Sequence, residues 1–365
     1  MPARPTSLVP PAPVIPPTPG TPAALGYRMP AEWEPHAATW LSWPRPDGIS
    51  FPGGGYARAV PALTKMVGAL AESEPVCINV CDDAHESEVR RCLAALPGGH
   101  GHVRFYRIPT NEPWCRDHGP IFVKREEDPK MAVCDFEYNA WGWKYPPFDD
   151  DDVVPTKVAD ALGGLPVYHP KIVLEGGSID VNGSGTLLTT ESCLLNPNRN
   201  PTLRRSQIET VIRDHLGVRN ILWLGDGIEG DDTDGHVDDL TRFVNRTTVV
   251  TVIEEDEHDT NHEPLQSNLY RLREMAAEDG SPLHVLTLPM PSKIVRDGQR
   301  LPASYANFYI ANKVVLLPVF SDPNDAWAAS VLRQALPGRK IVPIDCRELI
   351  WGLGAFHCLT QQQPA

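Results

Sequence analysis

The chain has 365 residues, of which 41% are hydrophobic and 22% are charged, an ordinary composition for a globular protein. This composition excludes a collagen, a coiled coil and a wholly disordered chain. Asp and Glu number 47 against 33 Lys and Arg, and the resulting net charge of -14 argues against a nucleic-acid partner, because an acidic surface repels phosphates. Such a surface favours a cationic small molecule. The longest apolar stretches fall far short of the roughly 20 residues that a membrane helix needs, so no membrane span is expected.

The first 26 residues contain nine prolines and no uninterrupted apolar segment of the kind found in a signal peptide. We therefore expect a disordered Pro-rich extension over residues 1–26 and a cytoplasmic protein. After residue 26 the composition is globular to the end, with no second linker, which predicts one domain over residues 27–365. The eight cysteines include no Cys-x-x-Cys pair, so neither a zinc knuckle nor a thioredoxin-type motif is present.

The first hundred residues predict a strand, a helix and a second strand, and then a further helix and strand. They lack the hairpin that recurs later. Four hairpins follow, recognised by alternation, β-branched residues and central turns. Each is succeeded by a helix that ends near a glycine, and then by one more strand. The predicted hairpins span residues 117–139, 177–195, 235–254 and 304–320, and the helices span 153–162, 202–216, 265–278 and 326–336.

This pattern is four copies of a strand-strand-helix-strand unit, and the first hundred residues form a fifth. The strand missing from the first unit would come from the C-terminal segment 355–363, which would join the two ends of the chain. Repetition of this kind predicts a closed ring of similar α/β units, because one unit alone cannot bury both of its faces. The alternative, an ordinary α/β sheet, would show single strands between helices and not hairpins.

Polar residues that could catalyse a reaction or bind a ligand stand at the starts of these units. Asp117 opens the second unit, Glu175 the third, and His236 with Asp238 the fourth. Cys358 lies on the segment assigned to close the first unit. In a ring of equivalent units these positions would point to a common axis, so we expect their side chains to converge there.

Cys358 is the candidate nucleophile, because it stands in a polar run after a Gly-rich segment and a thiolate is reactive beside a cation. His236 is the candidate general acid/base. Asp238, two residues further on, would lie on the same face of a strand. Each residue also has an ordinary interpretation: a buried thiol, a structural imidazole, or, for Asp117 and Glu175, a turn residue beside glycine.

A metal site is an alternative suggested by the acidic run 229–239 and by His258 and His262. The run does not match the spacing of an EF-hand, and the histidines lack the Glu of a His-Glu-x-x-His helix. We therefore expect no metal and no organic cofactor. A third class, a non-catalytic module that only captures a cation, would bind its ligand without releasing ammonia.

Six segments, in order, resemble the agmatine deiminase family, which includes the bacterial peptidylarginine deiminases among the guanidino-modifying (pentein) enzymes. Together they span nearly the whole chain from about residue 27 onward. Their sequences are MPAEWEPHAATWLSWP (29–44), NEPWCRDHGP (111–120), LEGGSIDVNGSGTLLTTESCLLNPNRNP (174–201), TDGHVDDLTRFV (233–244), ASYANFYIANKVVLLPVF (303–320) and FHCLTQQQP (356–364).

The resemblance implies a fivefold pseudosymmetric α/β propeller. It also implies hydrolytic deimination of agmatine to N-carbamoylputrescine and ammonia, a step toward the polyamine putrescine, through a thiouronium on the cysteine. Cys358 would be the nucleophile, His236 the acid/base and Glu175 its partner. The other implied roles are guanidinium binding by Asp117 and Asp238 and an aromatic pocket wall at Trp114.

One segment departs from the family pattern. WGLGAFHC (351–358) is bulkier than the family's WGGGGIHC-like form, since Leu, Ala and Phe resist backbone shapes that glycine permits. The substrate therefore stays open between agmatine and another guanidine, such as a peptidyl-arginine or a guanidino natural product. The oligomeric state is open as well.

Overall fold

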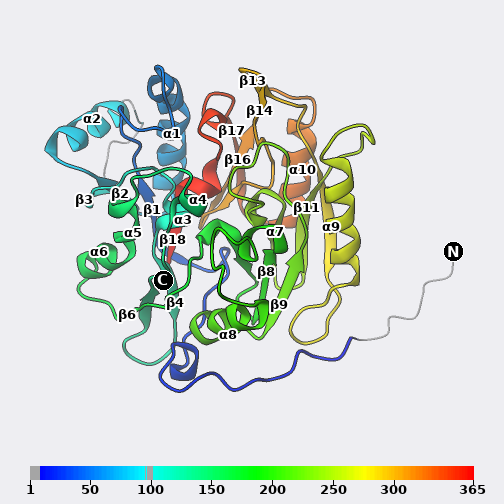
Figure 1. Ribbon diagram of the computed structural model, residues 1–365. Helices are drawn as coiled ribbons and strands as arrows, with labels where there is room; N and C mark the ends of the chain where they lie inside the picture. The colour runs from blue at the N-terminus through cyan, green and yellow to red at the C-terminus, as the bar shows by residue number, and fades with distance from the viewer. Residues whose placement is uncertain (1–8, 95, 97–101) are drawn as a thin grey trace.

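The computed structural model describes residues 9–94, 96 and 102–365. Figure 1 shows an α/β fold in which the longer helices lie on the outside of the molecule and short helical turns lie among the strands. The helices are α1 (Gly55–Ala71), α2 (Asp83–Leu93), α3 (Cys115–His118), α4 (Ala140–Trp143), α5 (Asp149–Asp152), α6 (Val154–Ala161), α7 (Glu191–Leu194), α8 (Arg205–Leu216), α9 (His262–Glu274), α10 (Asp325–Ala335) and α11 (Phe356–Leu359). The 3₁₀ turns are η1 (Ala23–Leu25), η2 (Gly176–Ser178), η3 (Val237–Asp239) and η4 (Ile350–Gly352).

Four small sheets share one pairing pattern, in which the first two strands are antiparallel and the third is parallel to the second. These sheets confirm the four predicted hairpins. They consist of β4 (Ile121–Lys124), β5 (Met131–Cys134) and β6 (Val167–Tyr168); β7 (Asp180–Val181), β8 (Thr186–Thr190) and β9 (Asn220–Leu224); β10 (Thr241–Phe243), β11 (Thr248–Ile253) and β12 (His284–Pro289); and β15 (Tyr309–Ile310), β16 (Val314–Val319) and β17 (Lys340–Asp345).

A four-stranded sheet joins the two ends of the chain, in the order β18-β1-β2-β3. Its strands are β1 (His36–Ser42), β2 (Val76–Val80), β3 (Val103–Arg107) and β18 (Thr360–Pro364). The C-terminal strand runs antiparallel to β1, with Thr39 opposite Gln362 and Leu41 opposite Thr360. The prediction that the C-terminal segment supplies the strand missing from the first unit is therefore confirmed. Cys358 therefore lies directly before a strand that pairs with residues near the start of the chain.

Between the second and third strands of each of the four repeated units lies one long helix, as predicted. The predicted helix 202–216 corresponds to α8, which ends at Gly217 in the left-handed conformation with φ 66°. Glycine adopts this conformation without steric cost, which explains the end of the helix. The sequence analysis missed the two-stranded ribbon of β13 (Val295–Arg296) and β14 (Gln299–Arg300), whose strands are only two residues long.

The structure corrects the placement of the candidate site residues on strands. His236 and Asp238 do not lie on a strand, since His236 precedes the 3₁₀ turn η3 that contains Asp238. Cys358 likewise lies in the short helix α11, and the strand begins only at Thr360. Such turns contain neither the 3.6-residue nor the two-residue period over a useful length, so periodicity could not separate them from the strands they precede.

The part of the Pro-rich extension that the structure describes makes contacts with the body of the protein. The backbone N–H of Ala12 donates to the carbonyl of Glu278 at 3.1 Å, and that of Thr18 donates to Asp214 Oδ1 at 2.9 Å. Residues 1–8 lie outside the described residues, and the disorder of residues 1–26 stays a prediction. Among the described residues, none of the helices is long and apolar enough to span a bilayer.

Candidate active site

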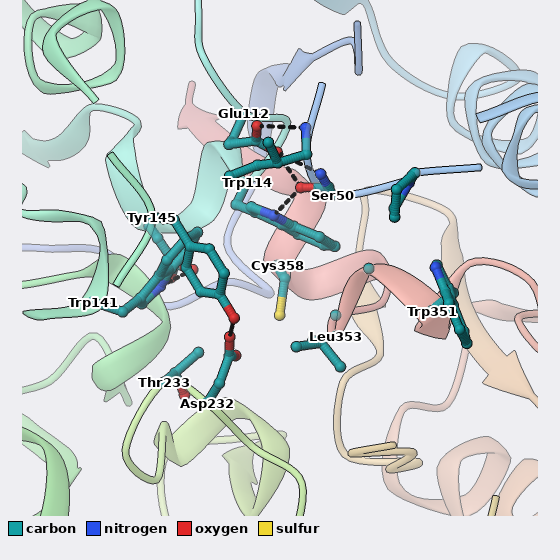
Figure 2. A pocket seen from close by; sticks show the side chains of 15 residues that line it. Ser50, Glu112, Trp114, Trp141, Tyr145, Asp232, Thr233, Trp351, Leu353 and Cys358 are labelled. Atoms are coloured by element: carbon teal, nitrogen blue, oxygen red, sulfur yellow. Dashed lines mark hydrogen bonds between the residues drawn. The ribbon is translucent and has the colours of Figure 1, made fainter. Parts of the chain in front are cut away.

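A cavity of about 150 Å³ opens where the short helical turns meet, and Cys358 lies at its wall (Figure 2). Aromatic and acidic side chains make up a large part of its lining. The rings come from Trp114, Trp141, Tyr145 and Trp351, and the carboxylates from Glu112, Asp117 and Asp232. Aromatic faces and carboxylates both attract cations. The cavity is therefore suited to a flat, positively charged group.

The thiol of Cys358 has one neutral donor and one carboxylate beside it. Asn307 Nδ2 donates to the sulfur at 3.0 Å, and Asp238 Oδ2 lies 3.6 Å from it. Asn307 Oδ1 also accepts the backbone N–H of His357 at 3.1 Å. Burial and the charges of Asp238, Asp239 and Asp117 raise the pKa of the Cys358 thiol well above its ordinary value. The sulfur is therefore a neutral thiol before substrate binds, and a bound cation would favour the thiolate.

Asp117 is fixed through both of its oxygens. Oδ1 accepts the backbone N–H of Gly177 at 3.0 Å, and Oδ2 accepts the indole N–H of Trp141 at 3.1 Å. Burial raises the pKa of this carboxyl to about 7, with His236 opposing the shift and Asp238 adding to it. A cation entering the cavity would stabilise the ionised form.

Gly177, the second residue after Glu175, has no room for a side chain. A Cβ atom at this position would lie 2.6 Å from both Asp117 Oδ1 and His236 Nδ1, and 3.1 Å from Asp238 Oδ2. Any side chain would therefore displace the three polar groups. The same distances show that these groups surround one point, as the ring of equivalent units predicts.

His236 lies between two carboxylates in the buried part of the site. Its Nδ1 is 3.6 Å from Asp117 Oδ1, and its Nε2 is 4.0 Å from Glu175 Oε2. Burial opposes a charge on the ring, but Asp117, the Cys193 thiol and Glu175 outweigh burial and raise the pKa of His236 well above its usual range. The imidazole is therefore a proton donor at neutral pH before substrate binds.

Glu175 has a guanidinium on its other oxygen. Arg199 Nε donates to Glu175 Oε1 at 2.6 Å, and the same side chain bonds Asp234 Oδ2 at 2.5 Å and the carbonyl of Thr233 at 2.8 Å. Glu175 Oε2 has no hydrogen-bond partner among the described residues and is left facing His236. Arg199 thus holds Glu175 in place beside the imidazole.

A metal-binding geometry occurs in one place among the residues that the structure describes. Glu175, Cys193 and His236 offer ligand atoms that lie within 4.8 Å of one another. Neither His258 nor His262 belongs to this group, and His262 Nδ1 is paired with the carbonyl of Glu254 at 2.8 Å. Burial raises the pKa of Cys193, so its neutral thiol is a weak ligand. This geometry therefore does not support a metal site formed by the acidic residues of the run 229–239 with His258 and His262.

Asp238 is oriented by a buried chain of hydrogen-bonded side chains that the sequence did not reveal. His357 Nδ1 contacts Asp238 Oδ2 at 2.6 Å, and its Nε2 contacts Glu32 Oε2 at 2.9 Å. Glu32 also accepts from Arg242 Nη2 at 2.8 Å. Because His357 bridges two carboxylates, one oxygen of Asp238 is fixed, and its other oxygen, Oδ1, has no partner within the described part of the chain.

All six residues chosen from the sequence lie in or under the cavity. Cys358, Asp117 and Trp114 line it. The others, His236, Glu175 and Asp238, are buried beneath it. The sequence analysis missed several residues that complete the site, namely Asn307, His357, Arg199, Cys193, Tyr145 and Asp232. The first four of these stand inside the segments that carry the family resemblance, and that position was the available signal.

We expect Asn307→Leu to slow alkylation of Cys358. The substitution keeps the branched shape of the side chain and removes the donor to sulfur, a hydrogen bond worth about 1 kcal/mol, or roughly 0.7 in pKa. The thiol pKa then rises, and iodoacetamide should react about fivefold more slowly at pH 8. Mass spectrometry of Cys358 over time measures this rate, and a thermal melt checks that the variant is folded. An unchanged rate would mean that Asn307 only fills space.

The fold and the site define an α/β protein with a thiol, an imidazole and several carboxylates around a cation-sized cavity. The family model described as Porphyromonas-type peptidyl-arginine deiminase matches residues 28–364, and the chain belongs to that family. The agmatine deiminase of Ectopseudomonas mendocina is 40% identical, over 94% of this chain and 97% of the relative.

Solved structures agree with the sequence comparison. The agmatine deiminase of Enterococcus faecalis superposes with a TM-score of 0.86 at 35% identity, over 94% of this chain and 97% of that one. A cysteine-to-serine variant of the agmatine deiminase from C. jejuni, with substrate bound, superposes with a TM-score of 0.84 at 30% identity, over 93% and 96% of the two chains.

Proposed function

We propose that this protein hydrolyses agmatine to N-carbamoylputrescine and ammonia. The observation that carries the proposal is the convergence of a thiol, an imidazole and two carboxylates around one buried point beside a cation-attracting cavity. The relatives named above support the substrate. Cys358 is the nucleophile, His236 the acid/base with Glu175 as its partner, and Asp117 and Asp238 bind the guanidinium.

Binding positions the substrate and activates the thiol. Asp117 and Asp238 accept hydrogen bonds from the guanidinium N–H groups, a strong charge-assisted geometry. Trp114 forms a wall of the cavity. The arriving positive charge lowers the pKa of Cys358, whose proton leaves to solvent, and the central carbon of the guanidinium is then held against the thiolate.

The chemistry follows in two halves. The thiolate attacks the guanidinium carbon, and the protonated His236 gives its proton to the departing nitrogen. Ammonia is released, and a thiouronium remains on the sulfur. Neutral His236 then takes a proton from water as the oxygen attacks the same carbon. The carbon–sulfur bond breaks, the thiolate returns, and the oxygen's remaining proton passes to ammonia. The raised pKa of His236 matches its role as the acid in the first half.

We also infer that the five sheets stand around a pseudo-fivefold axis, as a propeller, with residues 27–365 as one catalytic domain. The shared pairing pattern supports this arrangement. So does the position of the site residues, which lie in or directly before the short turns α3, η2, η3 and α11. The first three turns precede the first strand of their unit, and α11 precedes the strand that closes the first unit.

A second candidate is a peptidyl-arginine, because the family description names that substrate. The catalytic groups would serve it equally well. The cavity volume of about 150 Å³ favours a small free guanidine.

Ammonia release from agmatine, arginine and a peptidyl-arginine in excess EDTA tests the proposal. We expect chelator-resistant release from agmatine and much slower release from the other two. Release from peptidyl-arginine alone would establish the second candidate. Release that EDTA abolishes would reject the metal-free mechanism, and silence with all three would reject both agmatine and peptidyl-arginine as substrates.

A further inference from the structure

His357 stands next to the nucleophile in the chain, and its ring is buried between two carboxylates. Its Nδ1 is 2.6 Å from Asp238 Oδ2, and its Nε2 is 2.9 Å from Glu32 Oε2. All three residues are at most 4% exposed. The catalytic steps given above use the imidazole of His236 and leave that of His357 without a role. The protonation of this second ring decides what it can do for the site.

Glu32 is surrounded by hydrogen-bond donors. Its Oε1 accepts the backbone N–H of Ile310 at 2.7 Å, and its Oε2 accepts from Arg242 Nη2 at 2.8 Å and from Arg116 Nη2 at 3.3 Å. Burial opposes a charge on this carboxyl, but Arg242 and His357 outweigh burial and hold the pKa of Glu32 well below its usual range. Glu32 is therefore ionised, and the ring nitrogen that faces it must carry a hydrogen.

A second hydrogen lies between His357 Nδ1 and Asp238 Oδ2, because two lone pairs would repel each other at 2.6 Å. An ordinary aspartic acid has a pKa of about 3.9 and an ordinary imidazolium one of about 6.5, so the nitrogen is the stronger base. The charge of Glu32 on the far side of the ring strengthens that preference. The hydrogen therefore belongs to the nitrogen, which makes His357 an imidazolium and Asp238 a carboxylate.

The other charged groups around this ring are two guanidinium groups and two carboxyls. Arg116 Nε donates to the backbone carbonyl of His357 at 3.4 Å, and Arg242 Nε donates to Asp180 Oδ2 at 2.9 Å. Asp239 Oδ1 accepts from Asn307 Nδ2 at 2.9 Å. Arg242 thus has a carboxylate at each end of its guanidinium, Glu32 and Asp180, which offset its charge. The imidazolium is left as the cation that contacts Asp238.

The two carboxylates proposed to bind the guanidinium therefore have different partners. Asp117 accepts from two neutral groups, the backbone N–H of Gly177 and the indole of Trp141, and burial raises its pKa to about 7. Burial also opposes the ionisation of Asp238, but the hydrogen bond and the charge of His357 outweigh burial and lower the pKa of Asp238. Asp238 is thus charged in the free protein, whereas Asp117 becomes fully ionised as a cation arrives.

We propose that His357 is a positioning residue whose positive charge keeps Asp238 ionised and oriented before the substrate binds. Glu32, from the start of the chain, holds the ring and its second proton. The imidazolium occupies Oδ2 of Asp238 and leaves Oδ1, which has no partner within the described part of the chain, for a guanidinium N–H. The inference rests on the proposed function and adds to it the group that charges one of the two substrate-binding carboxylates.

Nitrogen NMR of the free protein tests the charge on the ring without any substrate. In protein with isotope-labelled histidine, the carbon-bound ring protons report the chemical shifts of both ring nitrogens. We expect both nitrogens of His357 to have the shifts of a protonated imidazole at pH 8. Its signals are those missing from folded His357→Gln or His357→Lys. His85 is the internal reference, because its Nδ1 accepts the backbone N–H of Cys81 at 3.1 Å and cannot also carry a proton. An unprotonated nitrogen in His357 would overturn the proposal.

Calorimetry of agmatine binding in the Cys358→Ser background tests what the charge does. His357→Gln removes the charge and keeps a side chain that can donate to one carboxylate. The pKa of Asp238 then rises, because burial is no longer opposed by a cation. We expect agmatine to bind at least about tenfold more weakly at pH 7, since a proton must first leave Asp238. The loss should shrink toward pH 9, where the carboxyl ionises without help. Asp117 titrates in both proteins, so the difference between them reports Asp238.

Two further variants separate charge from shape. His357→Lys restores a cation and should restore the pH dependence of the Cys358→Ser background. His284→Gln removes an exposed histidine at the start of β12 and should change nothing. A loss of equal size from pH 6 to pH 9 in folded His357→Gln, or a folded lysine variant that behaves like the glutamine variant, would overturn the role of the charge. If the background protein binds no agmatine while His357 carries both ring protons, the proposed function fails and the charge assignment stands.

Discussion

Cys358→Ser should release ammonia from agmatine at least about 10⁴-fold more slowly, because loss of an attacking nucleophile leaves only binding and electrostatic effects. A serine hydroxyl is not ionised by a nearby cation as a thiol is. Agmatine should still bind, since Asp117 and Asp238 are unchanged. Rapid-quench or steady-state ammonia assays measure the rate, and calorimetry measures the binding.

Cys81→Ser is the matched control. Cys81 is half-buried, and its sulfur contacts the carbonyl of Thr110 at 3.7 Å, a bond that a serine can replace. It should retain full activity. Turnover by Cys358→Ser near the parent rate would reject the covalent mechanism.

The same thiol gives a pH prediction. Because the pKa of Cys358 is raised before substrate binds, the thiolate fraction is small at pH 7 and grows as pH rises. Alkylation by iodoacetamide should therefore keep accelerating up to and beyond pH 9, where an ordinary exposed cysteine, with a pKa of about 8.5, approaches its plateau. A plateau below pH 8 would mean that the free protein already stabilises the thiolate.

The repeat could be predicted because its signals are local. Hairpins, helix-ending glycines and the spacing between units all occur within short windows, and the structure confirms the hairpins as four sheets of one pattern. The glycine signal is confirmed where α8 ends at Gly217, whereas α9 ends at Glu274, before Gly280. The closing strand was predictable for a different reason: a first unit that lacks a strand and a C-terminal strand without a partner can satisfy each other. The two-residue strands β13 and β14 were too short for periodicity to detect.

The site residues also divide into those with a local sequence signal and those whose roles depend on distant parts of the chain. Cys358, His236 and Asp117 stand in polar runs beside glycine, so their chemistry was visible in the sequence. His357 was passed over although it adjoins Cys358, because its role depends on Glu32, 325 residues away in the chain. Asn307 likewise bonds a sulfur 51 residues away. Long-range pairs of this kind are set by the closure of the fold, which no local pattern encodes.

The second large effect concerns Asp238, where activity and thiol reactivity should change in opposite directions. Asp238→Asn removes the charge that faces the guanidinium, and kcat/KM for agmatine should fall roughly 10²- to 10³-fold, since an unpaired buried cation is costly. The same charge raises the pKa of Cys358. Its removal should therefore lower that pKa and speed alkylation by iodoacetamide severalfold at pH 8.

The asparagine keeps an oxygen that can accept from His357, so the chain from Glu32 to position 238 should persist. Exposed Asp226→Asn controls for a general effect of charge. If alkylation slows together with turnover, Asp238 acts by holding the loop of Cys358, and its role in binding the guanidinium is wrong. If alkylation speeds up while turnover falls, one carboxylate both binds the substrate's charge and keeps the thiol protonated until that charge arrives. Activation of the nucleophile would then depend on the substrate itself.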